Sequence, residues 1–386
     1  FNTTIRGCTI SNNRRGIFCE ASSTIFVLGC EISNNTVSGA CFSCSSNVLI
    51  FGCRTRYNWC GIYCGESSNI TISGCKISGN GKYGIDCWRS SNISVFGCEI
   101  SNNHAYGVYC GGSSGVMISF CIICSNMKHG LYNSGNPTVN ATYNWWGDSG
   151  GPEKAGGDPE DPEEVYGSVI YEPWLTEPYL PPVILITYPT SGAIITTDII
   201  TVVWDVVQGT HAIVKVEIRL DCGSWIDVTG RTSFTFARLS GGRHVVTIRA
   251  MDETDYTSVY SVEFFYVVFP PKITITYPSN GTTITTDAVT VRWNVIEGSY
   301  AIFKVEIRLD DASWINVTGK TSYTFTGLSG GKHTITIRAV DERGYINQCT
   351  VKFYVLPKGV PPTYVWYVVG AIAAIAIVIG ITMKKR

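Results

Sequence analysis

The chain has 386 residues, of which 15% are charged, and its formal net charge at pH 7 is −1. This length is enough for two to four domains, each with its own hydrophobic core. The near-zero charge, with no basic block before the last three residues, excludes the electrostatic surface of a nucleic-acid binder. The 16 cysteines do not indicate a disulfide scaffold, because such scaffolds are much smaller than this chain.

The N-terminal part of the chain contains a repeat of 22 or 23 residues. Glycine–cysteine pairs mark it, and the cysteines at this position are Cys8, Cys30, Cys53, Cys75, Cys98 and Cys121. Two further columns in the same register are Ile10, Ile32, Thr55, Ile77, Ile100 and Ile123, and Cys19, Phe42, Cys64, Cys87, Cys110 and Asn133. Each repeat has three short segments in which apolar residues alternate, and alternation is the periodicity of β-strands. A unit this small buries its apolar face only by stacking, so the pattern predicts a right-handed parallel β-helix.

Polar residues also occupy fixed positions of this repeat. One asparagine per repeat forms the column Asn13, Asn35, Asn58, Asn80, Asn103 and Asn126, and a serine pair recurs as well. Stacked amides can hydrogen-bond from coil to coil, and asparagine tolerates the left-handed conformation of a turn. Another column places Glu31, Arg54, Lys76 and Glu99 in successive coils, with opposite charges adjacent at both ends. These columns predict structural ladders.

The repeat stops at Asn133, and a distinctive closing region follows. It contains Asn144-Trp145-Trp146-Gly147-Asp148, then Gly151-Pro152, an acidic loop (Asp158 to Glu164) and the segment Pro173-Trp174-Leu175. Adjacent tryptophans can cover the open edge of a stack of strands, and the last segment is predicted to be a capping strand.

This closing region, together with the coils, resembles parallel β-helix repeat proteins of archaeal and bacterial surfaces, which are relatives of the pectin-lyase-like and NosD-like families. The resemblance covers about residues 1–178 and implies a surface protein, with an archaeal source expected. These families include polysaccharide lyases and hydrolases, a copper-site accessory protein and many non-catalytic surface proteins. Because Phe1 lies inside a repeat and no secretory signal precedes it, we expect the true N-terminus to be missing.

A second, longer repeat follows, and its two copies are offset by 89 residues. Trp204, His244 and the run 215–221 recur as Trp293, His333 and the run 304–310. Alternating runs broken by Gly-Gly turns predict about seven short strands per copy, with the tryptophan in the core of a β-sandwich. The copies resemble bacterial and archaeal Ig-like modules, so we expect Ig-like domains at 179–268 and 269–356. The two histidines occupy equivalent positions and are expected to be fold residues rather than catalysts.

The end of the chain has the composition of a membrane anchor. After a linker at 357–363, the run Tyr364–Met383 is uncharged and rich in Ala, Ile, Val and Gly, and it is long enough for a transmembrane helix. Aromatic residues lie at one end of this run, and the basic tail 384–386 at the other end predicts the cytoplasmic side. We therefore expect a single-pass protein of the cell membrane, in contact with the lipid bilayer through Tyr364–Met383 and with its bulk outside the cell.

Seven Asn-x-Ser/Thr sequons would suit an exported glycoprotein. They begin at Asn2, Asn34, Asn69, Asn92, Asn140, Asn280 and Asn316. Because Asn, Ser and Thr are frequent in this chain, several sequons are expected by chance.

Groups suited to polysaccharide cleavage are sparse. The acids before residue 140 are Glu20, Glu31, Glu66, Asp86 and Glu99. Glu31 and Glu99 share a column but lie three coils apart, which is too far for the carboxylate pair of a glycosidase. Asp86 with Arg89 is the best local pairing, and we interpret it as a surface ion pair.

Two cysteine pairs have the spacing of metal ligands. Cys41 and Cys44 are three residues apart, as are Cys121 and Cys124. A strand directs residues three apart to opposite faces, and the cysteine columns are better interpreted as small apolar side chains of the core. The sequence therefore assigns no catalytic, cofactor-binding or metal-binding residue.

The expected fold class is all-β: a right-handed parallel β-helix and two Ig-like β-sandwiches, plus one C-terminal transmembrane α-helix. This organisation favours a non-catalytic surface protein that displays the β-helix on an Ig-like stalk, for adhesion, envelope structure or carbohydrate binding. The expected partners are surface glycans or other envelope proteins, without nucleic acid or cofactor. The alternative is a polysaccharide lyase or glycoside hydrolase whose active coils lie upstream of Phe1. A metal-delivery module is a third alternative.

Overall fold

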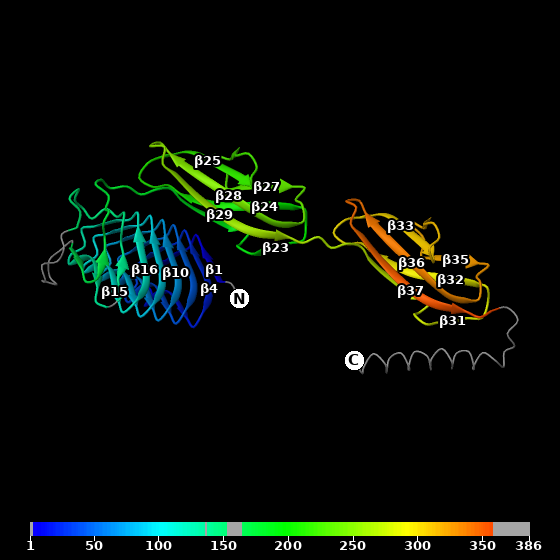
Figure 1. Ribbon diagram of the computed structural model, residues 1–386. Helices are drawn as coiled ribbons and strands as arrows, with labels where there is room; N and C mark the ends of the chain where they lie inside the picture. The colour runs from blue at the N-terminus through cyan, green and yellow to red at the C-terminus, as the bar shows by residue number, and fades with distance from the viewer. Residues whose placement is uncertain (1–2, 136, 153–163, 358–386) are drawn as a thin grey trace. The chain divides into compact units, whose positions relative to one another are not determined.

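The computed structural model describes residues 3–135, 137–152 and 164–357, and these residues form β-strands throughout (Figure 1). They belong to two compact units, Phe1–Ile194 with Ile199–Phe265 and Ile195–Asp198 with Tyr266–Arg386. A parallel β-helix and Ig-like sandwiches are present, which confirms the expected all-β architecture. The predicted transmembrane helix at 364–383 lies outside the described residues. Within the described ranges, no helix is long and apolar enough to cross a bilayer.

The β-helix consists of three parallel sheets, to which successive coils contribute one strand each. The first sheet contains β1 (Thr3–Arg6), β4 (Ser23–Leu28), β7 (Ser46–Phe51), β10 (Ser68–Ser73), β13 (Ser91–Phe96), β16 (Ser114–Ser119), β19 (Val139–Asn140) and β21 (Val169–Ile170). The second contains β2 (Thr9–Ser11), β5 (Glu31–Ser33), β8 (Arg54–Arg56), β11 (Lys76–Ser78), β14 (Glu99–Ser101) and β17 (Ile122–Cys124). The third contains β3 (Arg15–Glu20), β6 (Ser38–Ser43), β9 (Cys60–Gly65), β12 (Tyr83–Trp88), β15 (Tyr106–Gly111), β18 (His129–Asn133) and β20 (Glu164–Tyr166).

The predicted inward columns form the core of the stack. Ile32, Ile77 and Ile100 are fully buried, and Cys75 and Cys98 are buried beside them. Four of the cysteines also form a ladder, because the backbone N–H groups of Cys30, Cys53, Cys75 and Cys98 donate to the thiol of the next coil, as from Cys75 to Cys98 Sγ at 3.4 Å. Cys8 is the exception to the prediction, since it is exposed in the first described coil. No disulfide bond joins any two of the sixteen cysteines.

The asparagine column forms the predicted amide ladder. Nδ2 of Asn80 donates to Oδ1 of Asn103 at 3.0 Å, and Nδ2 of Asn103 donates to Asn126 at 2.9 Å. The expectation that these asparagines adopt the left-handed conformation was wrong. Positive φ belongs to the preceding residue of each turn, namely Asn12, Asn34, Tyr57, Gly79, Asn102 and Ser125. The ladder asparagine must instead direct its amide inward to reach the next coil.

A glycine column next to this ladder is fixed by close backbone contact. A Cβ on Gly84 would lie 2.6 Å from the carbonyl oxygen of Gly107 and 2.8 Å from Asn103 Nδ2. Gly39, Gly61 and Gly107 meet the same obstruction from the following coil. Any side chain here would therefore push successive coils apart.

The predicted charge column pairs across coils. Glu31, Arg54, Lys76 and Glu99 are in register, and Lys76 Nζ lies 2.7 Å from Glu99 Oε2. Glu31 forms its ion pair with Arg56, two residues along the strand from Arg54.

The two tryptophans close the last coils in different ways. Trp146 is buried against the core of the stack, whereas Trp145 extends the second sheet through a bridge to Ile122. The acidic loop falls mostly outside the described residues. Beyond it, Glu164–Tyr166 and Val169–Ile170 each add a short strand to the stack.

Each sandwich packs a three-stranded sheet against a five-stranded one. The first contains β22 (Val183–Tyr188), β24 (Ile199–Val207) and β27 (Ser233–Ala237), with β23 (Ala193–Ile195), β29 (Thr257–Tyr266), β28 (Gly242–Asp252), β25 (Ile213–Leu220) and β26 (Ile226–Asp227). The second contains β30 (Lys272–Tyr277), β32 (Ala288–Ile296) and β35 (Ser322–Thr326), with β31 (Thr283–Ile284), β37 (Ile346–Val355), β36 (Gly331–Asp341), β33 (Ile302–Leu309) and β34 (Ile315–Asn316). Trp204 and Trp293 are 1% exposed, so both are core residues as predicted.

Candidate functional site

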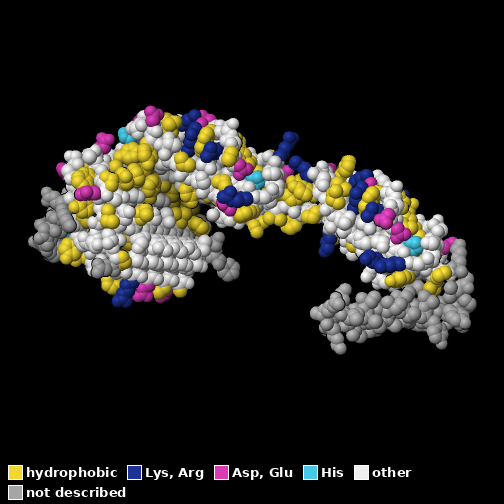
Figure 2. All heavy atoms as spheres, in the orientation of Figure 1, with side chains coloured by type: hydrophobic (Ala, Val, Ile, Leu, Met, Phe, Trp, Pro, Cys, Tyr) yellow, Lys and Arg dark blue, Asp and Glu magenta, His cyan; other side chains and the backbone are white. Residues whose placement is uncertain are grey.

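The outer face of the third sheet of the β-helix carries the candidate site. Phe18 and Glu20, and their equivalents in the other coils, alternate outward along each strand, whereas Arg15 and its equivalents reach the same face from the start of the strand. The parallel register aligns all three positions from coil to coil. The three outward columns are Arg15, Ser38, Cys60, Tyr83, Tyr106, His129; Phe18, Cys41, Tyr63, Asp86, Tyr109, Tyr132; and Glu20, Ser43, Gly65, Trp88, Gly111. Charged side chains are sparse on the face of the stacked coils that Figure 2 shows.

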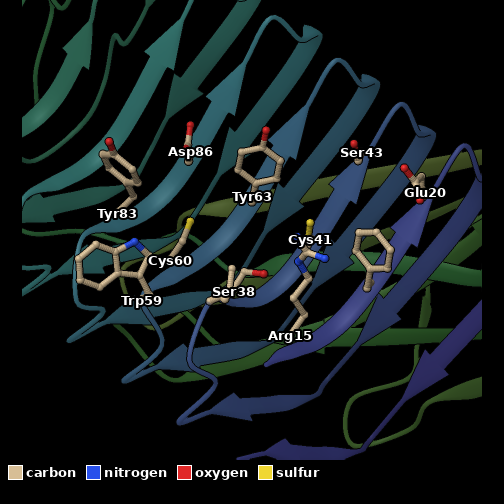
Figure 3. A pocket seen from close by; sticks show the side chains of 12 residues that line it. Arg15, Glu20, Ser38, Cys41, Ser43, Trp59, Cys60, Tyr63, Tyr83 and Asp86 are labelled. Carbon is tan, nitrogen blue, oxygen red and sulfur yellow. The ribbon is translucent and has the colours of Figure 1, made fainter. Parts of the chain in front are cut away.

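A hollow of about 630 Å³ lies over β3, β6, β9 and β12. Figure 3 shows its lining side chains projecting from these four neighbouring strands and from the turn that carries Trp59. Aromatic rings form much of its wall: Phe18 is 48% exposed and Trp59 is 54% exposed, while Tyr63 and Tyr83 are half-buried. Gly81 supports the Trp59 ring, because a Cβ there would come within 3.2 Å of it.

Two charged side chains in the hollow have buried polar atoms without hydrogen-bond partners. Within the described chain, Nε of Arg15 and Oδ1 of Asp86 make no hydrogen bond. The Arg15 guanidinium instead lies 4.6 Å from the centroid of the Phe18 ring. An unpaired buried polar group costs about 1–3 kcal/mol, so both side chains are held in the hollow at a cost in stability.

Asp86 is the most perturbed acid of the hollow. Burial raises the pKa of Asp86 to about 6, and the nearby Lys82 ammonium lowers it in part. The carboxyl group is therefore able to donate a hydrogen bond in mildly acidic solution as well as to accept one.

The predicted ion pair between Asp86 and Arg89 is not formed within the described residues. Asp86 projects outward from β12, whereas Arg89 follows the strand with a φ of 49° and places its guanidinium 5.4 Å from the Trp88 ring centroid. The change of backbone conformation at Arg89 separates the two side chains.

The acids of the hollow are too far apart for glycoside hydrolysis. Glu20 lies on β3 and Asp86 on β12, which are three strand positions apart. At about 4.8 Å per strand the separation is about 14 Å, whereas glycosidase carboxylates lie about 5–9.5 Å apart. This geometry favours binding over hydrolysis.

The cysteines of the hollow are not arranged as metal ligands. Cys41 projects into the hollow, whereas Cys44 lies in an exposed turn with a φ of 50°. Burial raises the pKa of the Cys41 and Cys60 thiols, which keeps both protonated. The second predicted pair is split as well, since Cys121 is in the core and Cys124 is half-buried on the second sheet. The part of the chain that the structure describes contains no group of three His, Cys, Asp or Glu able to hold a metal ion.

Beyond the hollow, a double column of stacked rings fills the same face. Tyr83, Tyr106 and His129 stack with centroids 5.6 Å apart at each step. Tyr132 lies 5.7 Å from Tyr109 and 4.6 Å from Tyr166 in the adjacent column. The faces of these rings are covered by neighbouring rings, so this region continues the hollow and does not form a second cavity.

The histidines of the sandwiches have structural partners, in agreement with their expected role as fold residues. Nδ1 of His244 lies 2.9 Å from Asp221 Oδ2, and Nδ1 of His333 lies 2.8 Å from Asp310 Oδ2. In each ring, Nε2 faces a backbone carbonyl oxygen, of Ser240 at 2.7 Å and of Ser329 at 2.8 Å. Both rings are almost completely buried.

Neither the hollow nor its lining residues can be recognised in the amino-acid sequence alone. Inward positions carry the same type of residue in every coil, so periodicity identifies them. The outward positions Arg15, Ser38 and Cys60 carry different residue types and share only their register. The recurrence of tyrosine in the outward columns is the signal that could have identified this face.

The comparisons with known proteins agree with this architecture. Residues 1–145 match the family described as right handed beta helix region, and residues 271–337 match the family described as bacterial Ig domain. No curated protein matches the chain.

Three solved structures align at low identity. The fibronectin(III)-like modules of Clostridium thermocellum CbhA are 16% identical over 46% of this chain and 97% of theirs, with a TM-score of 0.23. Dimeric latent PorU from Porphyromonas gingivalis is 12% identical over 46% of this chain and 20% of its own, with a TM-score of 0.21. Extracellular domains 3–5 of Drosophila OTK are 14% identical over 50% of this chain and 64% of theirs, with a TM-score of 0.20. Similarity this low carries no inference about function.

Proposed function

We propose that this chain is an extracellular surface protein whose β-helix binds carbohydrate on the outer face of its third sheet. The observation that supports the proposal is the hollow in which the exposed rings of Phe18 and Trp59 accompany the unpaired polar atoms of Arg15 and Asp86. Sugars present apolar C–H faces and ring hydroxyl groups together, so aromatic faces beside hydrogen-bonding groups are suited to hold them. Successive coils are about 4.8 Å apart, which is comparable to the length of one sugar residue in a chain.

The remaining parts of the chain provide display and attachment. A β-helix followed by Ig-like domains fits an extracellular surface-type protein. In this proposal the two sandwiches are the stalk, Tyr364–Met383 is the membrane anchor, and the basic tail 384–386 lies in the cytoplasm. The β-helix then faces the surroundings of an archaeal or bacterial cell, where it contributes to adhesion or to the envelope.

Binding is tested with the purified chain on a panel of neutral and acidic oligosaccharides, with affinities measured by calorimetry. Trp59→Ala and Asp86→Ala should each weaken binding at least tenfold, because they remove a stacking face and a hydrogen-bonding carboxyl group. Met117→Ala is the matched control, since Met117 is 52% exposed on the first sheet, away from the hollow. The proposal would be refuted if no glycan of the panel bound to the chain. It would also be refuted if both hollow variants bound glycans as tightly as the unmodified chain.

Attachment is tested by truncation before Tyr364. The full chain should fractionate with membranes, and the truncated chain should be released in soluble form. Retention of the truncated chain in the membrane fraction would contradict the proposed anchor.

Polysaccharide cleavage is the second candidate function, and the raised pKa of Asp86 is the observation that favours it. A carboxyl group with a pKa near 6 can serve as a general acid. The assay is release of reducing ends and unsaturated products from pectins, alginates and neutral glycans. We expect no turnover, because among the described residues of the hollow no second acid lies at catalytic distance from Asp86. Turnover that disappears in Asp86→Asn would make the enzyme the better description.

A further inference from the structure

The sequons differ in how their side chains are held, and this difference selects one of them as an acceptor. Asn69 and Asn92 are exposed, but both have positive φ, and their Nδ2 atoms donate to Asn47 Oδ1 at 3.1 Å and Asn69 Oδ1 at 3.2 Å. Asn34 also has positive φ, and its sequon passes through the buried ladder residue Asn35. In these three sequons, the hydroxyl group is not directed to its own asparagine.

The remaining described sequons begin at Asn140, Asn280 and Asn316. The hydroxyl of Thr282 donates to the Ser279 carbonyl rather than to Asn280, whose Oδ1 accepts from Lys352 N. Asn140 accepts the Thr142 hydroxyl at 3.0 Å but is half-buried in a paired strand.

Asn316 combines exposure with a local geometry that, among the other described sequons, only the half-buried Asn140 shares. Its Oδ1 accepts both the backbone N–H of Thr318 at 2.9 Å and the Thr318 hydroxyl at 2.8 Å. Its Nδ2 makes no hydrogen bond within the described chain, so the nitrogen that would be modified is free. Asn316 lies on β34, which is the edge strand of its five-stranded sheet, and the side chain is exposed.

We propose that Asn316 is the acceptor for N-linked glycosylation of the folded chain. The co-reactant is an oligosaccharide activated as a polyprenyl diphosphate. The Asn316 Nδ2 forms a bond to the anomeric carbon, the bond from that carbon to the diphosphate oxygen breaks, and the amide proton passes to a base of the transferase. A glycan at this position would also cover an edge strand, whose unpaired backbone groups are otherwise open to association.

The first sandwich provides a natural control at the same place in the fold. Asp227 occupies the position of Asn316, and Thr229 N donates to its Oδ1 at 2.9 Å, as Thr318 N does to Asn316. A carboxylate has no amide nitrogen to modify. We therefore expect glycosylation at this position in the second sandwich and not in the first, and we expect Asp227→Asn to create a second acceptor.

The proposal takes its cellular setting from the extracellular location in the proposed function, but its test is independent of sugar binding by the hollow. The folded full chain is incubated with a transferase that accepts folded proteins and a polyprenyl-diphosphate oligosaccharide, and occupancy is measured for each sequon by peptide mass spectrometry. Asn316 should be modified at least tenfold more than Asn69 or Asn92, Asn316→Gln should abolish the signal, and Asp227→Asn should add one. Tryptic peptides of the same chain provide the control in which the fold no longer selects among sequons.

Two results would overturn the inference. One is modification of Asn69 or Asn92 in the folded chain in preference to Asn316. The other is an unmodified Asn316 in the folded chain when its tryptic peptide is modified. Loss of glycan binding in the Trp59→Ala variant would leave the Asn316 result unchanged, so failure of either proposal can be recognised separately.

Discussion

The phenol of Tyr179 donates a hydrogen bond of 2.8 Å to Oδ2 of Asp252, which is fully buried. Asp341, the equivalent acid of the second sandwich, has the same local turn but a buried Oδ2 without a hydrogen-bond partner. The position that corresponds to Tyr179 is Val268, so the second sandwich has no phenol there. The two sandwiches have nearly the same strands, but the equivalent buried carboxylates differ in their hydrogen bonds at Oδ2.

Removal of this phenol should destabilise the first sandwich. We expect Tyr179→Phe to lower its free energy of unfolding by about 1–3 kcal/mol, because the variant leaves Oδ2 of the buried Asp252 without this hydrogen bond. Hydrogen exchange of the β28 amides, measured by mass spectrometry, localises the effect to this domain. Tyr188→Phe is the control, since Tyr188 is 45% exposed. Equal exchange rates in both variants would show that the Tyr179 bond contributes nothing.

The stability of the second sandwich should depend on pH through His333. Burial lowers the pKa of His333, but the Asp310 carboxylate and the Ser329 carbonyl outweigh this effect and leave the pKa raised. A raised folded-state pKa stabilises the domain fully below the unfolded value of about 6.5, and this contribution is lost as the pH rises through the folded pKa.

This pH dependence is measured by hydrogen exchange of β36 between pH 5 and pH 9, corrected for intrinsic exchange. Asp310→Asn should flatten the profile, because the asparagine carries no charge that favours the imidazolium. A profile that is unchanged in this variant, or stability that rises through the same range, would contradict the assigned role of Asp310.

The stability of the β-helix should also fall as the pH rises, through Asp86. Its folded pKa of about 6 lies above the value of about 3.9 for an unfolded chain, so the native state loses stability as the pH rises between these values and retains the full penalty above them. We expect Asp86→Asn to stabilise the β-helix at pH 7 by about 1–3 kcal/mol and to remove this part of the pH dependence. Urea unfolding monitored at pH 4 and pH 7 measures both effects. Destabilisation at pH 7 would show that the carboxylate is satisfied.

The amide ladder should be more sensitive to substitution than the surface of the same coil. Asn80→Ala removes an amide that is bonded to both neighbouring coils, and we expect a loss of about 2–4 kcal/mol for several unmade bonds. Thr71→Ala is the control, because Thr71 is exposed on β10. Thermal unfolding followed by circular dichroism compares the two variants. A similar midpoint in both would show that the ladder is dispensable.

The cysteines should divide sharply by reactivity in the folded chain. Cys75 and Cys98 are buried, and burial raises the pKa of both thiols, so alkylation in native buffer should be slow. Cys8, Cys44 and Cys222 are exposed and should react at least a hundredfold faster. Peptide mass spectrometry after timed iodoacetamide treatment gives the rate for each residue. Rapid labelling of Cys75 would show that the inward register is wrong by one residue.

The sequence by itself determined the stack and its inward register. Each coil of a β-helix contacts only its neighbours, so the volume at Ile32, Ile77 or Ile100 is constrained in the same way in every repeat, and the constraint appears as a column. The duplication of Trp204 as Trp293 determined the two sandwich cores for a similar reason, since alternation and one large buried ring are local properties of a strand.

Only the tertiary structure decided which outward side chains form a site. The surroundings of an outward residue include side chains from up to three coils away, and these differ in residue type. Arg15, Trp59 and Asp86 line one hollow because strand stacking and turn conformation bring them together. The left-handed residue before each ladder asparagine and the separation of Asp86 from Arg89 also became visible only in the structure. A sequence periodicity identifies residues that are buried against equivalent residues of the next coil. The burial and hydrogen bonding of surface residues depend on segments that are distant in the sequence, so no periodicity predicts them.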